Sequence, residues 1–179
     1  MTRREFPLAP LQPRVWMLPV AIALAVAVAA TVLPQTRQLP APAWLAGPFM
    51  VALLFVPLLL AIRRRRITVD GRTLVVAATF YTRSLDVDAI DLEHARILSL
   101  AEHTGFAPRL KLNGYNLPGF HAGPFLLRNR QRAFCLLTSR ERVLVLPQRD
   151  GKRLLLTSPD RPRELLEHLR GLAASPARR

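Results

Sequence analysis

The sequence predicts a protein of the α+β class, mainly β, in which an N-terminal transmembrane α-hairpin precedes a small antiparallel β domain that ends in a helix. Three observations predict this class. Two long apolar runs without a charged residue lie in the first third of the chain, short strand-like runs follow them, and the last leucines recur with helical period. A chain of 179 residues has room for one ordinary domain with such an appendage.

The composition excludes several classes of protein. Half of the residues are hydrophobic, which is too many for a disordered tail. A single cysteine, Cys135, excludes a disulfide-stapled domain, and its apolar neighbours Phe134 and Leu136 predict an inert core thiol. Lys and Arg number 26 against 12 Asp and Glu, so the net charge is +14. Such a charge indicates nucleic acid or an acidic membrane surface as a partner.

The two apolar runs, residues 15–33 and 44–62, predict the helices of a transmembrane hairpin over residues 15–62. As a helix each run would reach about 28 Å, close to the ~30 Å hydrocarbon core of a bilayer. A cleavable signal peptide is the alternative for the first run, but Pro34 and Gln35 do not form a small-residue cleavage site. The sequence therefore favours an integral membrane protein with two spans.

The arginines predict the orientation of this hairpin. The connecting loop holds only Arg37, whereas the second run is followed without a break by four arginines, Arg63, Arg64, Arg65 and Arg66. The positive-inside rule then places both termini in the cytoplasm, with residues 1–14 as a cytoplasmic segment of a multi-pass protein of the cell inner membrane. Because neither run contains an ionisable residue, we expect an anchor rather than a transporter. Alanines at every fourth position of the first run leave homo-oligomerisation open.

Residues 63–172 predict one small cytoplasmic domain, and residues 173–179 a basic tail. Short runs of strand-forming residues recur at a spacing of roughly 8–12 residues, which is typical of an antiparallel sandwich or barrel. About seven strands are expected from the candidate runs, which are two around the turn Asp70-Gly71 within residues 67–76, then 84–87, 95–100, 125–127, 133–138, 143–146 and 153–157.

A helix is expected after the last strand. Asp160 is a suitable N-cap, and Pro162 is tolerated in the first turn because the N–H groups there have no partner within the helix. Four leucines at helical spacing predict a single buried stripe, Leu165, Leu166, Leu169 and Leu172.

A stretch in the middle of this domain resembles a known family. It runs Asn113-Gly-Tyr-Asn-Leu-Pro-Gly-Phe-His-Ala-Gly-Pro-Phe125 and is followed by a strand that ends in Thr138-Ser-Arg140. This is similar to the bacterial PH-like (pleckstrin-homology-like) domain family, whose membrane-anchored members carry a two-helix hairpin and a Gly-x-Gly-Leu-Pro-Gly-aromatic stretch, although Asn116 replaces a usual glycine. The resemblance covers residues 63–172. It implies a PH-like antiparallel barrel with a C-terminal helix and no known catalytic residues.

We call six residues of this stretch the motif loop: Gly114, Leu117, Pro118, Gly119, Phe120 and Gly123. Its glycines can adopt positive φ, and its proline stiffens the bend between them. A purely structural role is favoured, and a ligand-facing loop is the alternative.

Catalytic and metal-binding patterns are scarce. The four histidines show no metal-ligand spacing, and the acidic residues Asp86, Asp88, Asp91 and Glu93 are interpreted as a solvated turn. We therefore expect no cofactor, no metal and no catalytic residue. The alternative is a membrane-bound hydrolase that uses His121 with a nearby serine or threonine, and a pocket joining His121 to a hydroxyl within hydrogen-bond reach would favour it.

The basic residues suggest the partner. Arginines recur at three predicted turns, Arg128, Arg130 and Arg132 at the first, Arg140 and Arg142 at the next, Arg149 and Arg153 at the last. They form either one basic rim facing the bilayer or a dispersed solubilising surface. Helix-turn-helix and zinc patterns are missing, so anionic lipid is preferred over nucleic acid. The sequence thus predicts a membrane-anchored, non-catalytic module that docks a protein partner or anionic lipid.

Overall fold

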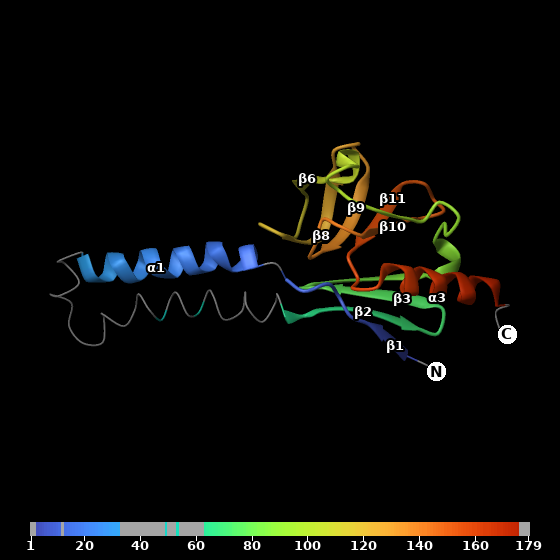
Figure 1. The fold of residues 1–179 in the computed structure, drawn as a ribbon, viewed down its shortest axis with the longest axis horizontal. Coiled ribbons are helices and arrows are strands. Elements are labelled where there is room, and N and C mark those ends of the chain that lie inside the picture. Colours follow the sequence, from blue (N-terminus) through green and yellow to red (C-terminus); the bar gives the residue numbers. More distant parts are fainter. Residues whose placement is uncertain (1–2, 12, 33–48, 50–52, 54–62, 176–179) are drawn as a thin grey trace. The chain divides into compact units, whose positions relative to one another are not determined.

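The computed structural model of the protein describes residues 3–11, 13–32, 49, 53 and 63–175 (Figure 1). The chain divides into two compact units. Residues 1–12 and 64–179 form the first, which we call the β domain, and residues 13–63 form the second. The β domain therefore takes in chain segments from both sides of the two hydrophobic runs.

The second unit begins with a short 3₁₀ helix, η1 (Pro13–Trp16), which leads into α1 (Met17–Val32). Helix α1 carries no charged residue and covers most of the first predicted span. Among the described residues, no helix is long and apolar enough to cross a membrane. The second predicted span, residues 44–62, lies outside the described residues except for Phe49 and Leu53. The transmembrane hairpin therefore stays a prediction.

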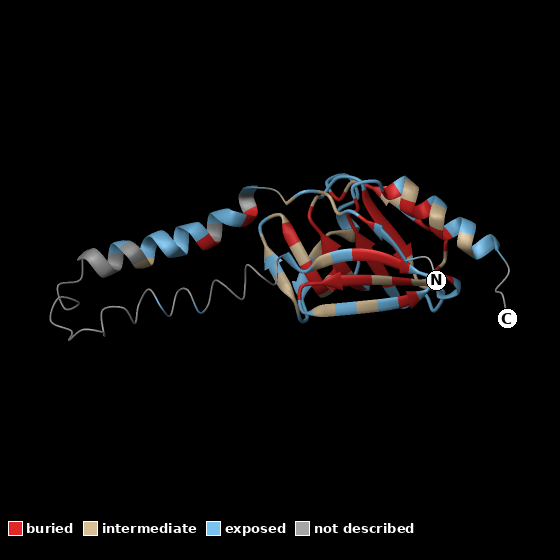
Figure 2. Ribbon diagram, turned by 90° about the horizontal axis from the view of Figure 1, so that it is seen from below, coloured by how far each residue is buried: buried red, intermediate tan, exposed pale blue. Residues whose placement is uncertain are grey.

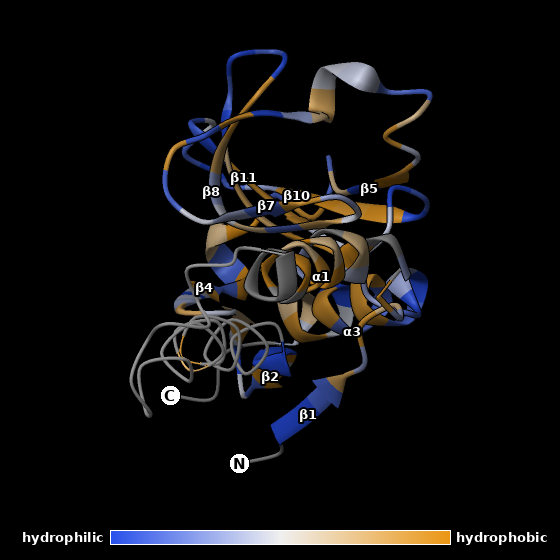
Figure 3. Cartoon of the chain, turned by 90° about the vertical axis from the view of Figure 1, so that its left-hand side faces the viewer, coloured by the Kyte–Doolittle hydropathy of each residue, from blue (hydrophilic) through white to orange (hydrophobic). Residues whose placement is uncertain are grey.

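The first sheet of the β domain has four antiparallel strands in the order β1-β2-β3-β4. Their bounds are β1 (Arg3–Phe6), β2 (Arg65–Asp70), β3 (Thr73–Ala78) and β4 (Tyr81–Asp86). The predicted hairpin between β2 and β3 is confirmed, but its two connecting residues are Gly71, at φ +57°, and Arg72, because Asp70 pairs with Thr73 at the end of β2. Strand β1 was not expected from the sequence, because its residues are mostly hydrophilic (Figure 3) and only their pairing with β2 makes them a strand.

The second sheet has seven strands in the order β5-β10-β11-β9-β8-β6, and β7 pairs with β8 beside this path. Their bounds are β5 (Arg96–Leu98), β6 (Pro108–Lys111), β7 (Tyr115–Leu117), β8 (Phe120–Leu127), β9 (Arg132–Leu137), β10 (Val143–Pro147) and β11 (Arg153–Thr157). Two short 3₁₀ helices, η4 (Val87–Ala89) and η5 (Thr104–Phe106), lie in the connections.

This arrangement confirms a mainly β fold with a C-terminal helix and differs from the prediction in two ways. The described residues contain eleven strands instead of about seven, because β1 and two strands of the glycine-rich middle, β6 and β7, add to the predicted ones. Strand β11 pairs with β9 in parallel, so the domain is not wholly antiparallel. Strand β10 lies between β9 and β11 in the sequence, and after it the chain runs back so that β11 is parallel to β9. Hydropathy patterns carry no information on this crossover.

The central strands of the seven-stranded sheet, β8, β9, β10 and β11, carry buried side chains on both faces (Figure 2). One face forms a core cluster that includes Phe125, Cys135 and Leu156. On the opposite face, Leu136 and Leu155 are also fully buried, as are inward residues of the four-stranded sheet such as Val76. The two sheets therefore enclose a second apolar core.

The C-terminal helix α3 (Pro162–Ala174) confirms the predicted leucine stripe. Leu165, Leu166 and Leu169 are buried, and Leu172 is half-buried. The predicted cap is wrong: the helix starts one residue later, with Arg161 at the N-cap and no side-chain capping bond. The N–H of Asp160 donates instead to the carbonyl of Pro7, 2.9 Å away.

Candidate anion-binding site

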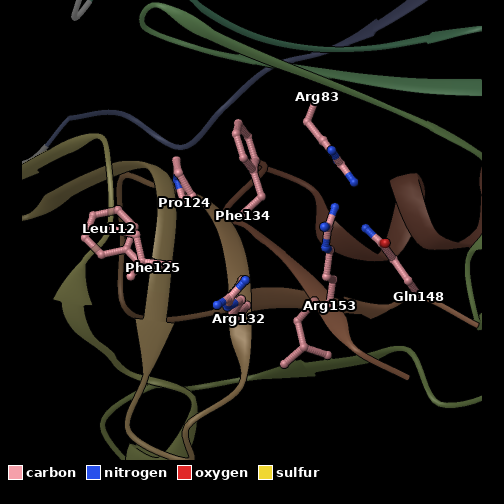
Figure 4. Close-up of a pocket in the computed structure, with 10 residues that line it drawn as sticks. Arg83, Leu112, Pro124, Phe125, Arg132, Phe134, Gln148 and Arg153 are labelled. Atoms are coloured by element: carbon pink, nitrogen blue, oxygen red, sulfur yellow. The ribbon is translucent and has the colours of Figure 1, made fainter. Parts of the chain in front are cut away.

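A pocket of about 200 Å³ lies between β4 of the four-stranded sheet and strands β8, β9 and β11 of the seven-stranded sheet (Figure 4). Three arginines line it, and they come from both sheets: Arg83, Arg132 and Arg153. Gln148, which follows β10, adds an amide, and the rest of the wall is largely apolar. We call this feature the three-arginine pocket. It is smaller than the ~300–1,000 Å³ of pockets for drug-sized ligands, so its size suits a small polar group.

Strand pairing explains why two of these arginines are neighbours. Arg132 and Arg153 are the first residues of β9 and β11, and the parallel register places them opposite each other. Like charges at such a cross-strand position are destabilising unless something neutralises them. On the other sheet, Arg83 lies opposite Val76, and this pairing places it on the inward face of β4.

The positive charges in this pocket have no partner from the described part of the chain. Figure 4 shows the guanidinium groups of Arg83 and Arg153 directed toward each other, with the side chain of Gln148 beside them. No ion pair among the described residues includes any of the three arginines, and none of the residues lining the pocket is acidic. Guanidinium groups bind phosphate and carboxylate through paired, charge-assisted hydrogen bonds. The geometry therefore fits an anionic ligand.

The other predicted basic residues lie in turns at the two ends of β9, although the side chains of Arg128 and Arg140 line a common second cavity. The turn with Arg128 and Arg130 precedes β9, so it lies at the end of the sheet where Arg132 starts that strand. Arg140 and Arg142 lie in the turn after β9, at its opposite end. Three arginines were singled out around the turn between β8 and β9, namely Arg128, Arg130 and Arg132. Of these three, Arg132 lines the three-arginine pocket.

The four arginines after the second hydrophobic run are not equivalent. Arg63 belongs to the second unit, whereas the other three belong to the β domain. Arg65 is half-buried on β2, where burial lowers the pKa of its guanidinium, and its buried Nη1 has no hydrogen-bond partner among the described residues. Arg66 is exposed and lies 3.9 Å from Glu5 of β1. Two of these four arginines, Arg65 and Arg66, are therefore part of strand β2 of the four-stranded sheet.

The motif loop forms the hairpin between β7 and β8. Leu117 pairs with Phe120, and Pro118 with Gly119 makes the two-residue connection. Gly119 has φ +82°, which the third position of a type II turn requires. Phe120 is fully buried and Leu117 is half-buried, so both side chains pack against the domain.

The two other glycines of the motif loop permit a close backbone contact. A Cβ on Gly114 would lie 2.3 Å from the carbonyl oxygen of Ala122, and one on Gly123 would lie 2.7 Å from that of Asn113. These distances support the structural role of both glycines. The contact also fixes the neighbouring Leu112, whose N–H donates to the carbonyl of Pro124, and both residues line the three-arginine pocket.

His121 faces a different cavity, of about 270 Å³, which is also lined by Thr104, Arg128 and Arg140. Its Nδ1 is buried with no hydrogen-bond partner among the described residues. Burial, and secondarily the charge of Arg140, lower the pKa of His121. No hydrogen bond joins the histidine to a hydroxyl in the described part of the chain, so the geometry does not supply the pair that a hydrolase would need.

The thiol and the carboxylates add no reactive group to these cavities. Cys135 is fully buried, which confirms its place in the core, and burial raises the pKa of its thiol. Among the described residues, no three histidine, cysteine or acidic side chains are grouped so that they could hold a metal ion.

Comparison with known families places this domain. The model of the bacterial PH domain family matches residues 65–173, from the first residue of β2 into α3. The chain belongs to the bacterial PH domain family. PH domains are typically non-catalytic interaction modules that generally bind proteins or lipids. No curated protein and no solved structure matched the chain.

Two residues of the candidate site in this bacterial PH domain were missed by the sequence analysis. Arg83 lies in β4, which begins at Tyr81, whereas the sequence predicted a strand over residues 84–87. The alternation of Tyr81, Arg83 and Leu85 was the available signal, because every second residue of a strand shares one face. Gln148 carried no local signal, since its place in the pocket depends on β10 pairing with β11 and on β11 pairing with β9.

Proposed function

We propose that this chain is a membrane-anchored interaction module. Its two hydrophobic runs hold the bacterial PH domain at the cytoplasmic face of the inner membrane, where the domain docks an anionic lipid surface or a protein partner and catalyses no reaction. The pairing of β1 with β2 is the observation that carries this proposal.

Strand β1 precedes the first hydrophobic run and β2 follows the second. Their antiparallel register sets Phe6 opposite Ile67 and Arg4 opposite Val69. Both ends of the intervening segment, residues 13–63, are thereby attached to one folded domain. A segment that leaves a domain and returns to it crosses a membrane an even number of times, which supports a two-span hairpin. The arginines beside the runs favour the cytoplasm for the domain.

Charge and location support the choice of partner. The chain carries a net charge of +14, and the three-arginine pocket has no acidic lining residue. A domain tethered at the cytoplasmic leaflet meets anionic lipid at high local concentration, and each basic side chain near that surface contributes about 1 kcal/mol of attraction. An acidic segment of a membrane-bound protein, including a second copy of this chain, would meet the same charges.

Two measurements on the full chain in cells test the proposal. Membranes are washed with alkaline carbonate, which releases peripheral proteins and retains integral ones. Alkaline phosphatase, which is active only outside the cytoplasm, is inserted between Ala43 and Trp44, and a fluorescent protein that matures only inside is fused after Arg179.

We expect the chain to resist carbonate and both reporters to be active. Release by carbonate would overturn the anchoring, and a dark C-terminal reporter with an inactive phosphatase would overturn the orientation. Moving the phosphatase to the C-terminus is the matched control, and there it should be inactive.

A further inference from the structure

We propose that the three-arginine pocket binds the phosphate of an anionic membrane phospholipid, while Phe80 and Leu112 contact its acyl chains. This inference rests on the membrane anchoring proposed above. It assigns to Arg83, Arg132 and Arg153 a ligand that the charge of the domain as a whole does not specify.

An exposed apolar patch adjoins the pocket. Phe80, Leu110 and Leu112 are 61%, 54% and 52% exposed, and they are the large hydrophobic side chains that the described part of the β domain leaves exposed. Leu112 also lines the pocket. An apolar surface beside a cationic pocket matches a phospholipid, whose phosphate lies next to its acyl chains.

Contacts between residues 80–81, at the start of β4, and residues 113–115, at the start of β7, hold this patch together. The ring of Phe80 lies 5.9 Å from that of Tyr115, and the hydroxyl of Tyr81 donates to Asn113 Oδ1 over 2.5 Å. Phe80 is therefore fixed beside the chain segment that carries Leu112. The arginine of the pocket on this strand, Arg83, is two residues beyond Tyr81, or about 7 Å along an extended strand.

The patch also lies where the chain comes from the second hydrophobic run. The N–H of Thr79, the residue before Phe80, donates to the carbonyl of Arg64 over 2.9 Å. Arg64 is only two residues past the end of that run, at residue 62. If the run spans the bilayer, Phe80 is within a few residues' length of the lipid headgroups, and a soluble ligand has no such reason to meet this surface.

The chemistry of the pocket suits a phosphate diester. Two guanidinium groups directed at each other, with a third opposite one of them in register, offer several N–H donors to the anionic oxygens. The side-chain amide of Gln148 adds one more group that can donate. A bound phosphate would relieve the repulsion among the three arginines, which have no carboxylate partner among the described residues.

The test uses the full chain in an uncharged detergent and titrates it with short-chain phosphatidylglycerol. Phosphatidylcholine with the same chains tests the need for net negative charge, sn-glycerol 3-phosphate tests the need for acyl chains, and a polyglutamate peptide represents an acidic protein segment. Binding is followed by native mass spectrometry. We expect phosphatidylglycerol to bind at least ~10-fold more tightly than each of the others.

A charge-matched pair of variants tests the pocket itself. Replacing Arg83, Arg132 and Arg153 by Gln should raise the dissociation constant for phosphatidylglycerol at least ~30-fold, because charge-assisted hydrogen bonds are lost. The control replaces three exposed basic residues that do not line the pocket, Arg109, Lys152 and Arg163, by Gln. It removes the same charge and should change the constant less than ~3-fold. Leu112→Ser should weaken the binding of phosphatidylglycerol and leave the binding of glycerol phosphate unchanged.

Equal loss of binding in the two triple variants would overturn the pocket and leave only general attraction. Glycerol phosphate binding as tightly as the lipid would show a soluble phosphate ligand, and preference for polyglutamate would show an acidic protein partner; each result would overturn the proposal. Because the titration is done in detergent, failure of the membrane anchoring appears separately, as release of the wild-type chain by carbonate.

Discussion

Phe6 of β1 lies opposite Ile67 of β2, and both side chains are buried in the β domain. The ring of Phe6 also lies 5.6 Å from that of His168 in α3. Next to it, Arg4 donates to Glu164 Oε1 of the same helix over 2.7 Å. The first residues of the chain therefore join the four-stranded sheet to the C-terminal helix, although the match to the bacterial PH domain begins only at residue 65.

Replacing Phe6 by Ala should destabilise the domain by about 3 kcal/mol, because a buried aromatic ring leaves a cavity between β1 and α3. Cys135 provides the measurement. It is the only cysteine of the chain and is fully buried, so the rate at which a thiol reagent labels it in urea reports the free energy of unfolding in the intact protein. Glu5→Ala, an exposed neighbour, should change that free energy by less than about 0.5 kcal/mol. Equal labelling of both variants would contradict the packing of β1.

The close contact in the motif loop makes a second prediction. Gly114→Ala should destabilise the domain by several kcal/mol, since its Cβ would lie 2.3 Å from a backbone oxygen and its φ is +148°. Gly151→Ala is the control, because Gly151 also has positive φ, at +64°, but has no atom within 4 Å of the added Cβ. The control should lose only about 1–2 kcal/mol, the cost of a left-handed alanine. Similar urea midpoints for the two variants would show that φ alone, and not the contact, requires glycine.

Local patterns predicted the elements whose cause is local. The hairpin at Asp70-Gly71, the leucine stripe of α3 and the buried Cys135 follow from turn chemistry and periodicity, and the structure confirms all three, with the turn one residue later, at Gly71 and Arg72. Strand β1 could not be predicted in this way, because three of its four residues are charged and it becomes a strand only by pairing with residues some sixty positions away.

The candidate site depends even more on distant pairing. Arg132 was singled out because arginines surround a turn, yet its place in the pocket results from the parallel register with Arg153. The third arginine, Arg83, comes from the other sheet. A charge pattern read along the chain shows which turns are basic, but the crossover between β9 and β11 and the packing of two sheets decide which arginines meet.

Helix α3 gives a third prediction. Leu169→Asp should unfold the domain or cost several kcal/mol, because Leu169 is fully buried and a carboxylate there would lose its hydration without a partner. The matched control is Leu172→Asp. Leu172 belongs to the same stripe but is half-buried, so this variant should lose clearly less stability. Labelling of Cys135 without urea distinguishes the two variants. If Leu169→Asp protected Cys135 as well as the wild type does, α3 would not be packed against the domain.

The pH dependence of stability gives the last prediction. Burial, and then the charge of Arg140, lower the pKa of His121 in the folded protein, so the unfolded chain binds a proton more readily. The stability is therefore complete above the usual histidine pKa of about 6.5 and decreases as the pH falls below it. His121→Gln should lose less stability than the wild type between about pH 7.5 and about pH 5.5. Cys135 labelling, scaled at each pH to the rate in the unfolded chain, measures this.

Two further variants attribute the effect to His121 and to its cause. Arg140→Gln keeps the histidine and removes the nearby charge, so the pKa of His121 should rise toward its ordinary value and the loss of stability in acid should become smaller. His103→Gln replaces an exposed histidine and should leave the loss unchanged. His168, whose pKa is also lowered by burial and by Arg4, accounts for part of the dependence that remains in His121→Gln. An unchanged slope in both His121→Gln and Arg140→Gln would show that the proton uptake belongs to other groups.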